Sequence, residues 1–200
     1  VSTSGFKKSR AEFEDLMYQT VKEPGAVSGL NSISPTGVQT GLGVRTAAIQ
    51  KDFEVGAGKI TKNALDIQVE GPGFFPLQLP DGQIGYTRDG QFKKDPQGRI
   101  VDKNGNPLQP EIVIPPNAAG IDISGNGTVS ATVGNSMVPQ VIGQIQLVNF
   151  VNPAGLKAMG KNVFMPSGSS GLPVQGQPGL NGLGELAQGQ VEASNVNIVD

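Results

Sequence analysis

Short apolar segments separated by turn residues occupy most of the chain after Val44. Alternation of apolar and polar residues, which is typical of half-buried strands, occurs at 65–69, 75–79 and 129–133. A mixed segment at 44–53 also fits a strand. No helical pattern separates these segments, so they predict a mainly β fold, an antiparallel β domain of short strands and hairpins. Further apolar segments lie at 84–86, 100–101, 112–114, 121–123 and 141–150.

The stretch 70–107 carries the most regular spacing of strand and turn signals. Its turn signals are Gly71-Pro72-Gly73, Pro80-Asp81-Gly82, Asp89-Gly90, Asp95-Pro96-Gln97-Gly98 and Asn104-Gly105-Asn106-Pro107. Asp and Asn are favoured before Gly or Pro at turns because their side chains bond to the nearby backbone. The stretch therefore predicts successive hairpins, and Pro76 indicates an edge strand or a bulge.

The N-terminal region contains a helix signal. Ser9–Glu12 fits a capping box, and the apolar residues that follow at helical spacing are Phe13, Leu16 and Met17. This pattern predicts a short helix over about 9–22, which ends before Pro24. Because so short a helix is not stable alone, its apolar stripe packs either on its own domain or on a partner.

Two regions lack periodicity. Tyr18–Gly43 contains Pro24, Pro35 and five glycines, and a loop of this length is usually functional or disordered. Pro166–Gly189 is rich in Gly, Pro, Ser and Gln and predicts a loop or return arm. We therefore expect a connecting segment (1–44) with an extended stretch over about 18–43, a β domain (45–165) and a return arm (166–200).

Composition excludes several classes of function. The net charge is −2, and no basic patch or run indicates binding to nucleic acid or anionic lipid. No apolar run is long enough for a membrane span, and no secretory signal core is present. The chain has neither Cys nor His, which removes disulfides, thiol nucleophiles, imidazole bases and nearly all structural zinc sites.

Three motifs resemble ligand sites, but each fails on its context. Gly56–Lys59 is similar to a phosphate loop, yet Ile60 replaces the residue that would bind Mg²⁺. Gly182–Ala187 matches a dinucleotide pattern but follows a loop instead of a strand. Calcium-loop spacing begins at Asp102, but Pro107 stands where Gly is required. We therefore predict a protein that is not an enzyme, with no catalytic residue, cofactor or metal.

The charged residues of the hairpin ladder have a structural interpretation. Asp81, Asp89 and Asp95 each precede Gly or Pro at a turn, so local backbone bonding accounts for them better than a paired-carboxylate site does. For Arg88 we expect a local ion pair or the capping of backbone carbonyls, with an anion site as the alternative.

Four motifs in chain order resemble those of the bacterial flagellar axial proteins, the rod and hook family. They are Ser4–Ser9, a signature in the β domain, Pro178–Gly182, and Gly189–Val196. The signature residues are Gly71, Gly73, Phe74, Phe75, Tyr86, Thr87, Arg88, Asp89 and Gly90. The extended stretch, with Tyr18-Gln19-Thr20 and Pro24-Gly25, is similar to an insertion of the distal rod members.

This resemblance implies a structural subunit of the distal rod, which polymerises helically into the rigid shaft that transmits motor torque. It implies contacts with copies of itself, with proximal rod proteins, with the hook or a junction protein, and with the P- and L-ring proteins. The implied location is the periplasmic rod of the basal body, reached through the flagellar type III apparatus without a cleaved signal peptide. Both family helices that drive polymerisation are absent from this sequence, so we expect a monomeric core fragment.

The subunit contacts are expected in the N-terminal region. The candidate residues are Phe13, Leu16, Met17, Tyr18, Leu30, Ile33, Val38 and Leu42. A hook or proximal rod subunit is an alternative function within the family. An exported β-rich adhesin or glycan-binding module is an alternative of another class, although the chain has no Trp and two Tyr to form an aromatic platform.

Overall fold

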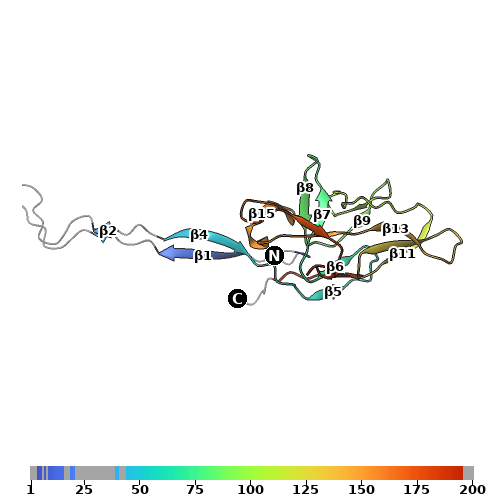
Figure 1. Cartoon of the computed structure of the whole chain (residues 1–200), viewed down its shortest axis with the longest axis horizontal. Coiled ribbons are helices and arrows are strands. Elements are labelled where there is room, and N and C mark those ends of the chain that lie inside the picture. The colour runs from blue at the N-terminus through green and yellow to red at the C-terminus, as the bar shows by residue number, and fades with distance from the viewer. Residues whose placement is uncertain are drawn as a thin grey trace, which may run out of the picture. The chain divides into compact units, whose positions relative to one another are not determined.

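The computed structural model describes residues 4–5, 7, 9–15, 19–20, 39–40 and 44–195. The chain forms two compact units, one made of residues 1–8 and 51–200 and the other of residues 9–50. We call the first the main unit and the second the arm unit, and we describe each by itself (Figure 1).

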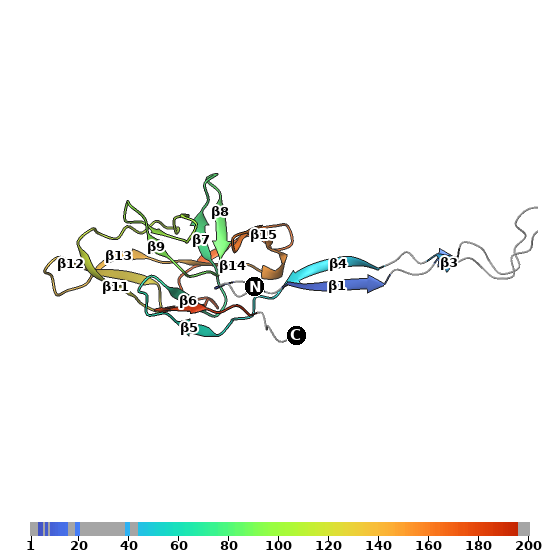
Figure 2. The ribbon, with the colours of Figure 1, turned by 180° about the vertical axis from the view of Figure 1, so that it is seen from behind.

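The arm unit consists of paired strands. Strand β1 (Ser9–Asp15) pairs with β4 (Val44–Lys51), and Figure 2 shows the two arrows running in opposite directions. Farther along, β2 (Gln19–Thr20) pairs antiparallel with β3 (Gln39–Thr40). The strand predicted at 44–53 is thus confirmed over β4, and part of the extended stretch is a ribbon.

The helix predicted over about 9–22 is wrong for residues 9–15, which form β1. Forming the first turn of a helix costs conformational entropy, and a helix of two turns makes too few hydrogen bonds to offset that cost. Pairing with β4 satisfies the backbone of this segment instead, and Ala11 and Phe13 also fit the two-residue period of a strand. The predicted contact residues Leu16, Met17, Tyr18, Leu30, Ile33, Val38 and Leu42 lie outside the described residues.

The main unit confirms the prediction of a mainly β, antiparallel fold. Its strands are β5 (Gly58–Ile60), β6 (Ile67–Glu70), β7 (Phe75–Gln78), β8 (Ile84–Thr87), β9 (Lys93–Lys94), β10 (Ile100–Val101), β11 (Ala118–Ile123), β12 (Thr128–Val133), β13 (Gln140–Gln144), β14 (Leu147–Asn149), β15 (Lys157–Gly160), β16 (Val163–Met165), β17 (Val174–Gly176), β18 (Glu185–Gln188) and β19 (Gln190–Glu192). One 3₁₀ turn, Pro153–Gly155, precedes β15. Within the described ranges, no helix has the length and apolarity that a membrane span requires.

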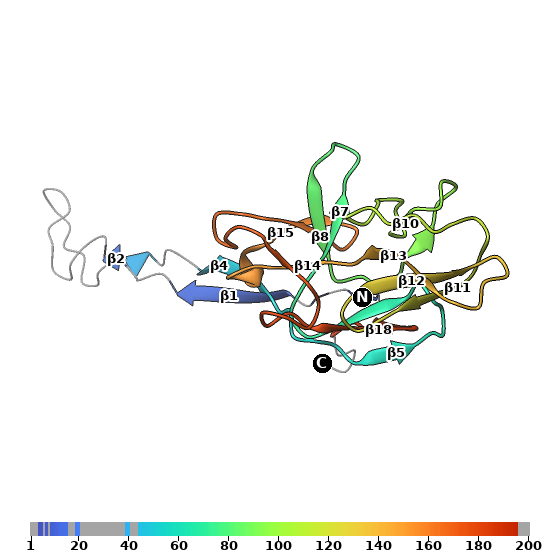
Figure 3. The ribbon, with the colours of Figure 1, turned by 45° about the vertical axis from the view of Figure 1, so that its right-hand side comes forward.

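The sheets of the main unit are small. Strands β15, β16, β8 and β7 form the largest sheet in that order, and β11, β12 and β13 form a three-stranded sheet (Figure 3). The segment predicted as a loop or return arm also contributes strands: β17 pairs with β14, β18 with β6, and β19 with β5. Its apolar residues are too few to show periodicity, but Leu186 and Val191 are buried at those pairings.

Two apolar clusters lie on opposite sides of β7, because successive side chains along a strand point to opposite faces. Phe75 and Leu77 face the larger cluster, as predicted from the spacing, while Phe74 faces a smaller, mainly aromatic cluster on the other side. In the smaller cluster, the ring of Phe74 packs edge-to-face against Phe53 at 5.2 Å and against Phe150 at 5.8 Å. Strand β7 comes last in the order of its sheet, as Pro76 indicated, but its outer side is covered, because Gln109 donates its N–H to the Pro76 carbonyl at 2.9 Å and Gln78 donates to Pro107 at 2.8 Å.

The turn aspartates bond to the backbone as predicted. Asp81 accepts from the backbone N–H of Gln83 at 3.0 Å, and Asp95 accepts from Gln97 at 3.0 Å. Asp102 accepts from the backbone of Asn104 and Asn106, at 2.9 and 2.8 Å. These carboxylates fix hairpin turns, which confirms the structural interpretation.

The backbones at Gly90 and Ile67 approach each other closely in the main unit. Ile67 donates its N–H to the Gly90 carbonyl, and a Cβ on Gly90 would lie 1.6 Å from the Ile67 carbonyl oxygen. We expect Gly90→Ala to lower the free energy of unfolding by about 4 kcal/mol or more, because strands must separate to admit the methyl group. Urea unfolding followed by circular dichroism measures this loss.

Gly168→Ala is the matched control, since nothing lies within 4 Å of a Cβ there. We expect it to change stability by less than about 0.5 kcal/mol. A Gly90→Ala protein as stable as this control would contradict the close approach.

Candidate functional site

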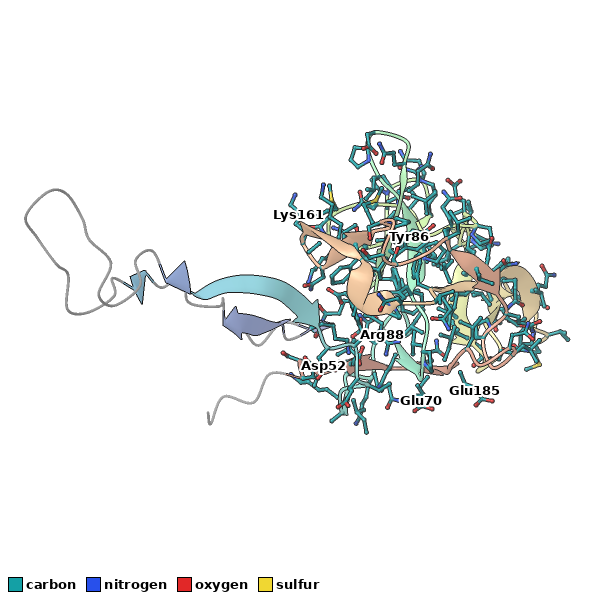
Figure 4. All side chains as sticks on the ribbon, turned by 60° about the vertical axis from the view of Figure 1, so that its left-hand side comes forward. Asp52, Glu70, Tyr86, Arg88, Lys161 and Glu185 are labelled. Carbon is teal, nitrogen blue, oxygen red and sulfur yellow. The ribbon has the colours of Figure 1, made fainter. Side chains whose placement is uncertain are left out.

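A buried cluster of three charged side chains joins segments from both ends of the main unit. Glu192, at the end of β19, accepts from Arg88 Nε at 3.1 Å and from Lys7 Nζ at 2.5 Å. All three side chains are 2% exposed or less. We call Lys7, Arg88 and Glu192 the terminal clamp, and Figure 4 labels Arg88 within it.

Arg88 follows β8, and its guanidinium also closes the connection from β6 to β7. Its Nη1 donates to the carbonyls of Gly71 and Gly73, at 2.6 and 2.7 Å, and its Nη2 donates to Val69 at 3.2 Å. Carbonyl capping is therefore confirmed, whereas the local ion pair that was its alternative is wrong. The ion pair is not local, because Glu192 lies 104 residues away, and each guanidinium nitrogen already donates within the protein, which does not favour an anion site.

Glu192 and Lys7 each have a further partner that anchors the segment following the arm unit. Lys7 Nζ donates to the Glu54 carbonyl at 2.9 Å, and Gly56 donates its N–H to Glu192 at 2.7 Å. The backbones also meet, since Ala193 donates to Ala57 at 2.8 Å. The carboxylate thus receives hydrogen bonds from three donors, which is the compensation that a buried charge requires.

The charges of the clamp shift each other's protonation. Burial by itself would raise the pKa of Glu192, but the charges and hydrogen bonds of Arg88 and Lys7 outweigh it and hold that pKa below the ordinary 4.5. Burial lowers the pKa of Lys7 below the ordinary 10.5, and the hydrogen bond and charge of Glu192 offset only part of this effect. The carboxylate is consequently ionised at neutral pH.

The turn at Asp89 lies against the N-terminal segment. The Asp89 carboxylate pairs with Lys103 at 2.5 Å and accepts from the backbone of Gln91 at 3.2 Å. Gly5 lies directly on this turn: its φ is +69°, and a Cβ there would be 2.6 Å from the Asp89 Cα. Gly5 also donates its N–H to the Glu192 carbonyl at 3.1 Å. Only glycine combines this conformation with this approach.

The signature residues predicted from the sequence come together as a structural region around the clamp. Gly71 and Gly73 supply carbonyls to Arg88, while Phe74 and Tyr86 enter the aromatic cluster. Thr87 accepts from the backbone of Asp89 at 3.0 Å, Gly90 approaches β6, and Phe75 enters the larger cluster. Of the predicted contact residues, only Phe13 has a described backbone, in β1.

Sequence reasoning missed Lys7 and Glu192 as individual residues, although both lie within motifs that it recognised. A usable signal was present, because Glu192 is the only charged residue between Glu185 and Asp200. A lone carboxylate next to the apolar Val191, which is buried, indicates a charge with a specific partner.

The match to a known family covers the region that contains the signature residues. Residues 68–131 match the family model described as the flagellar hook protein FlgE/F/G D1 domain. The chain is 48% identical to the flagellar basal-body rod protein FlgG of Buchnera aphidicola subsp. Schizaphis graminum, over all of this chain and 77% of that protein. It is 44% identical to FlgG of Caulobacter vibrioides, over all of this chain and 76% of that protein.

The similarity to a hook protein is more limited. The flagellar hook protein FlgE of Helicobacter mustelae is 36% identical over 115 residues, which cover 54% of this chain and 24% of that protein.

Removing the charge of Glu192 tests the clamp. Glu192→Gln keeps the shape of the side chain but leaves Lys7 and Arg88 buried without a counter-ion. We expect the free energy of unfolding at pH 7 to fall by about 3–5 kcal/mol. Urea unfolding measures this loss, with the exposed Glu185→Gln as a control that we expect to stay within about 0.5 kcal/mol of the original protein.

Acid pH gives a second readout for the same pair of variants. Because the folded-state pKa of Glu192 lies below 4.5, its contribution is complete above that pH and is lost as the pH falls through the folded pKa. The original protein and Glu185→Gln should show this loss, and Glu192→Gln should lack it. Equal acid dependence in all three proteins would contradict a stabilising role for the ionised carboxylate.

Proposed function

We infer that this chain, which belongs to the FlgG family of flagellar basal-body rod proteins, is a structural subunit of the flagellar distal rod. The observation that carries this function is similarity over the whole chain to proteins of that name, at 48% and 44% identity to two of them. A hook subunit is not favoured, because the FlgE similarity covers 54% of the chain. An adhesin or glycan-binding module is not favoured either, since the relatives that span the chain are rod proteins.

The terminal clamp suits a subunit that carries mechanical load. Lys7 precedes the arm unit, residues 54–56 follow it, and Glu192 bonds to both segments and to Arg88 in the middle of the main unit. Force applied along any of these segments would therefore pass into the two packed clusters instead of bending a loop. A stiff main unit of this kind supports the transmission of torque.

The arm unit is proposed as the contact with neighbouring subunits. Its residues 9–50 form a compact unit separate from the main unit, and its described strands form a ribbon. A short strand pair is marginal alone in water, so packing on another subunit would supply stability. We place the contact residues Phe13, Leu16, Met17, Tyr18, Leu30, Ile33, Val38 and Leu42 in this interface, where they make the rod straight and stiff.

The proposed partners are copies of the chain in a helical rod, proximal rod proteins, the hook or a junction protein, and the P- and L-ring proteins. The family localises to the basal-body rod, and we propose a periplasmic position that is reached by flagellar type III export without signal cleavage. We propose a purely mechanical function without catalysis, and the isolated chain should be monomeric in dilute solution.

A chimera tests the proposed function. Residues 1–200 of this chain replace the aligned 76% of FlgG in Caulobacter vibrioides, and the rest of that protein is kept. We expect the cells to assemble rods and hooks, because the main unit and arm unit would supply the same contacts. Electron microscopy of isolated basal bodies and a swimming assay measure the outcome.

The same chimera with Gly90→Ala is the control and should give no distal rod, since its main unit cannot close. A stable, exported chimera whose basal bodies stop before the distal rod would overturn the proposed function.

Deletion of Tyr18–Gln39 from the chimera tests the role of the arm. We expect rods that are curved or flexible, because the contacts that hold neighbouring subunits in register would be lost. The curvature of rods in electron micrographs measures this effect, and replacement of the same residues by a flexible Gly/Ser linker controls for length. Straight and rigid rods after the deletion would contradict the proposal.

A further inference from the structure

The residues described before the arm unit, Ser4, Gly5 and Lys7, attach to the main unit without joining a strand. We call these three residues the N-terminal segment. Gly5 donates its N–H to the Glu192 carbonyl at 3.1 Å, and the side-chain amide of Asn162 donates to the Ser4 carbonyl at 3.2 Å. The remaining polar attachment of the segment is the buried ammonium of Lys7, so its docking depends strongly on the terminal clamp.

The two cations of the clamp differ in what they would retain if Glu192 lost its charge. Within the described residues, Lys7 Nζ would keep one acceptor, the Glu54 carbonyl at 2.9 Å. Arg88 would keep three, because its two terminal nitrogens donate to carbonyls at the end of β6 and in the β6–β7 connection. An ammonium carries three N–H donors, so Lys7 would be left as a buried charge that is largely unpaired.

Release of the N-terminal segment is the local way to return Lys7 to water. It breaks the bonds of Ser4 and Gly5 but no strand pairing. Strand β19 stays attached through its pairing with β5, and Val191 in that strand is buried. Arg88 directly follows β8 and is held by its carbonyl acceptors, so it stays in place. Openings of this kind require less free energy than unfolding of the whole unit.

We propose that the terminal clamp is an acid-operated latch, in which protonation of Glu192 releases the N-terminal segment while the rest of the main unit stays folded. Arg88 and Lys7 hold the pKa of Glu192 below the ordinary 4.5, so the carboxylate is ionised and the segment docked above that pH. Release follows as the pH falls through the folded pKa. The latch acts within one chain and goes beyond the proposed rod function, so neither depends on the other.

The other charged groups around the N-terminal segment do not provide the same latch. Asp89 lies against the segment, but its carboxylate pairs with Lys103, whose side chain is 37% exposed and can regain water without moving the segment. The charge of Asp52 also acts on Lys7, but Asp52 is exposed, so its protonation strands no buried charge. Glu54 contacts Lys7 through its backbone carbonyl, which does not titrate.

Hydrogen exchange of the full chain, measured by NMR, tests the latch. The Gly5 amide reports docking, because it bonds to Glu192, and the Phe74 amide reports the main unit, because it donates to Val148 at 2.9 Å among buried residues. Protection factors, corrected for the intrinsic pH dependence of exchange, are followed from pH 7 downward. We expect protection of Gly5 to fall by about 100-fold, since a buried ion pair has lost one charge, while Phe74 remains protected.

Lys7→Met and Lys103→Met are the matched variants. Lys7→Met removes the buried ammonium and fills most of its space, so protonation of Glu192 strands no lysine, and we expect Gly5 protection to stay within about threefold over the same pH range. Lys103→Met removes the other lysine ion pair beside the segment and should keep the acid release of the original protein. Near-ultraviolet circular dichroism checks that both variants fold.

Each outcome decides the proposal. Loss of Gly5 protection while Phe74 stays protected, in the original protein and in Lys103→Met but not in Lys7→Met, supports the latch. Joint loss of Gly5 and Phe74 protection, or Gly5 protection that persists for as long as the main unit is folded, overturns it, and the original protein alone decides this. Equal acid release in Lys7→Met also overturns it, because another carboxylate would then be responsible.

Discussion

The ion pairs of Glu192 are the constraint on which the main unit depends. A buried carboxylate is tolerated only when hydrogen bonds and opposite charge replace the water that it loses, and here Lys7 and Arg88 supply both. These partners lie 185 and 104 residues away in the sequence. The carboxylate is satisfied only when the N-terminal segment, the turn after β8 and strand β19 are assembled together, which links both ends of the main unit to its middle.

The packing around the clamp explains why its neighbours are glycine, aromatic and acidic residues. Arg88 caps the carbonyls of the β6–β7 connection, and Gly5 and Gly90 let backbones approach where a side chain would collide. Phe74 packs on the other side in the aromatic cluster. The family signature is therefore largely a set of contacts around one buried charge. A subunit that passes torque needs such a junction where its segments enter the body.

Local patterns predicted the β domain well because its strands are short and bounded by turn residues, and several of them alternate apolar and polar positions. The edge position of Pro76 and the turn bonds of Asp81, Asp95 and Asp102 also followed from local chemistry. The helix predicted over about 9–22 was wrong for Ser9–Asp15, because capping and spacing do not reveal that strand β4, Val44–Lys51, provides a partner. Local patterns did not predict strands β17 to β19, because their apolar residues are too few to alternate. These strands form only by pairing with segments that are distant in the sequence.

The sequence alone determined the fold class, the positions of the turns and the order of the motifs that identify the family, since each depends on residues near one another in the chain. Tertiary structure decided which partners Arg88 takes and that Lys7 and Glu192 belong to the site. The physical reason is that the sequence near a charge or an aromatic ring indicates that it requires a partner. Which residue becomes that partner depends on how the fold brings distant segments together.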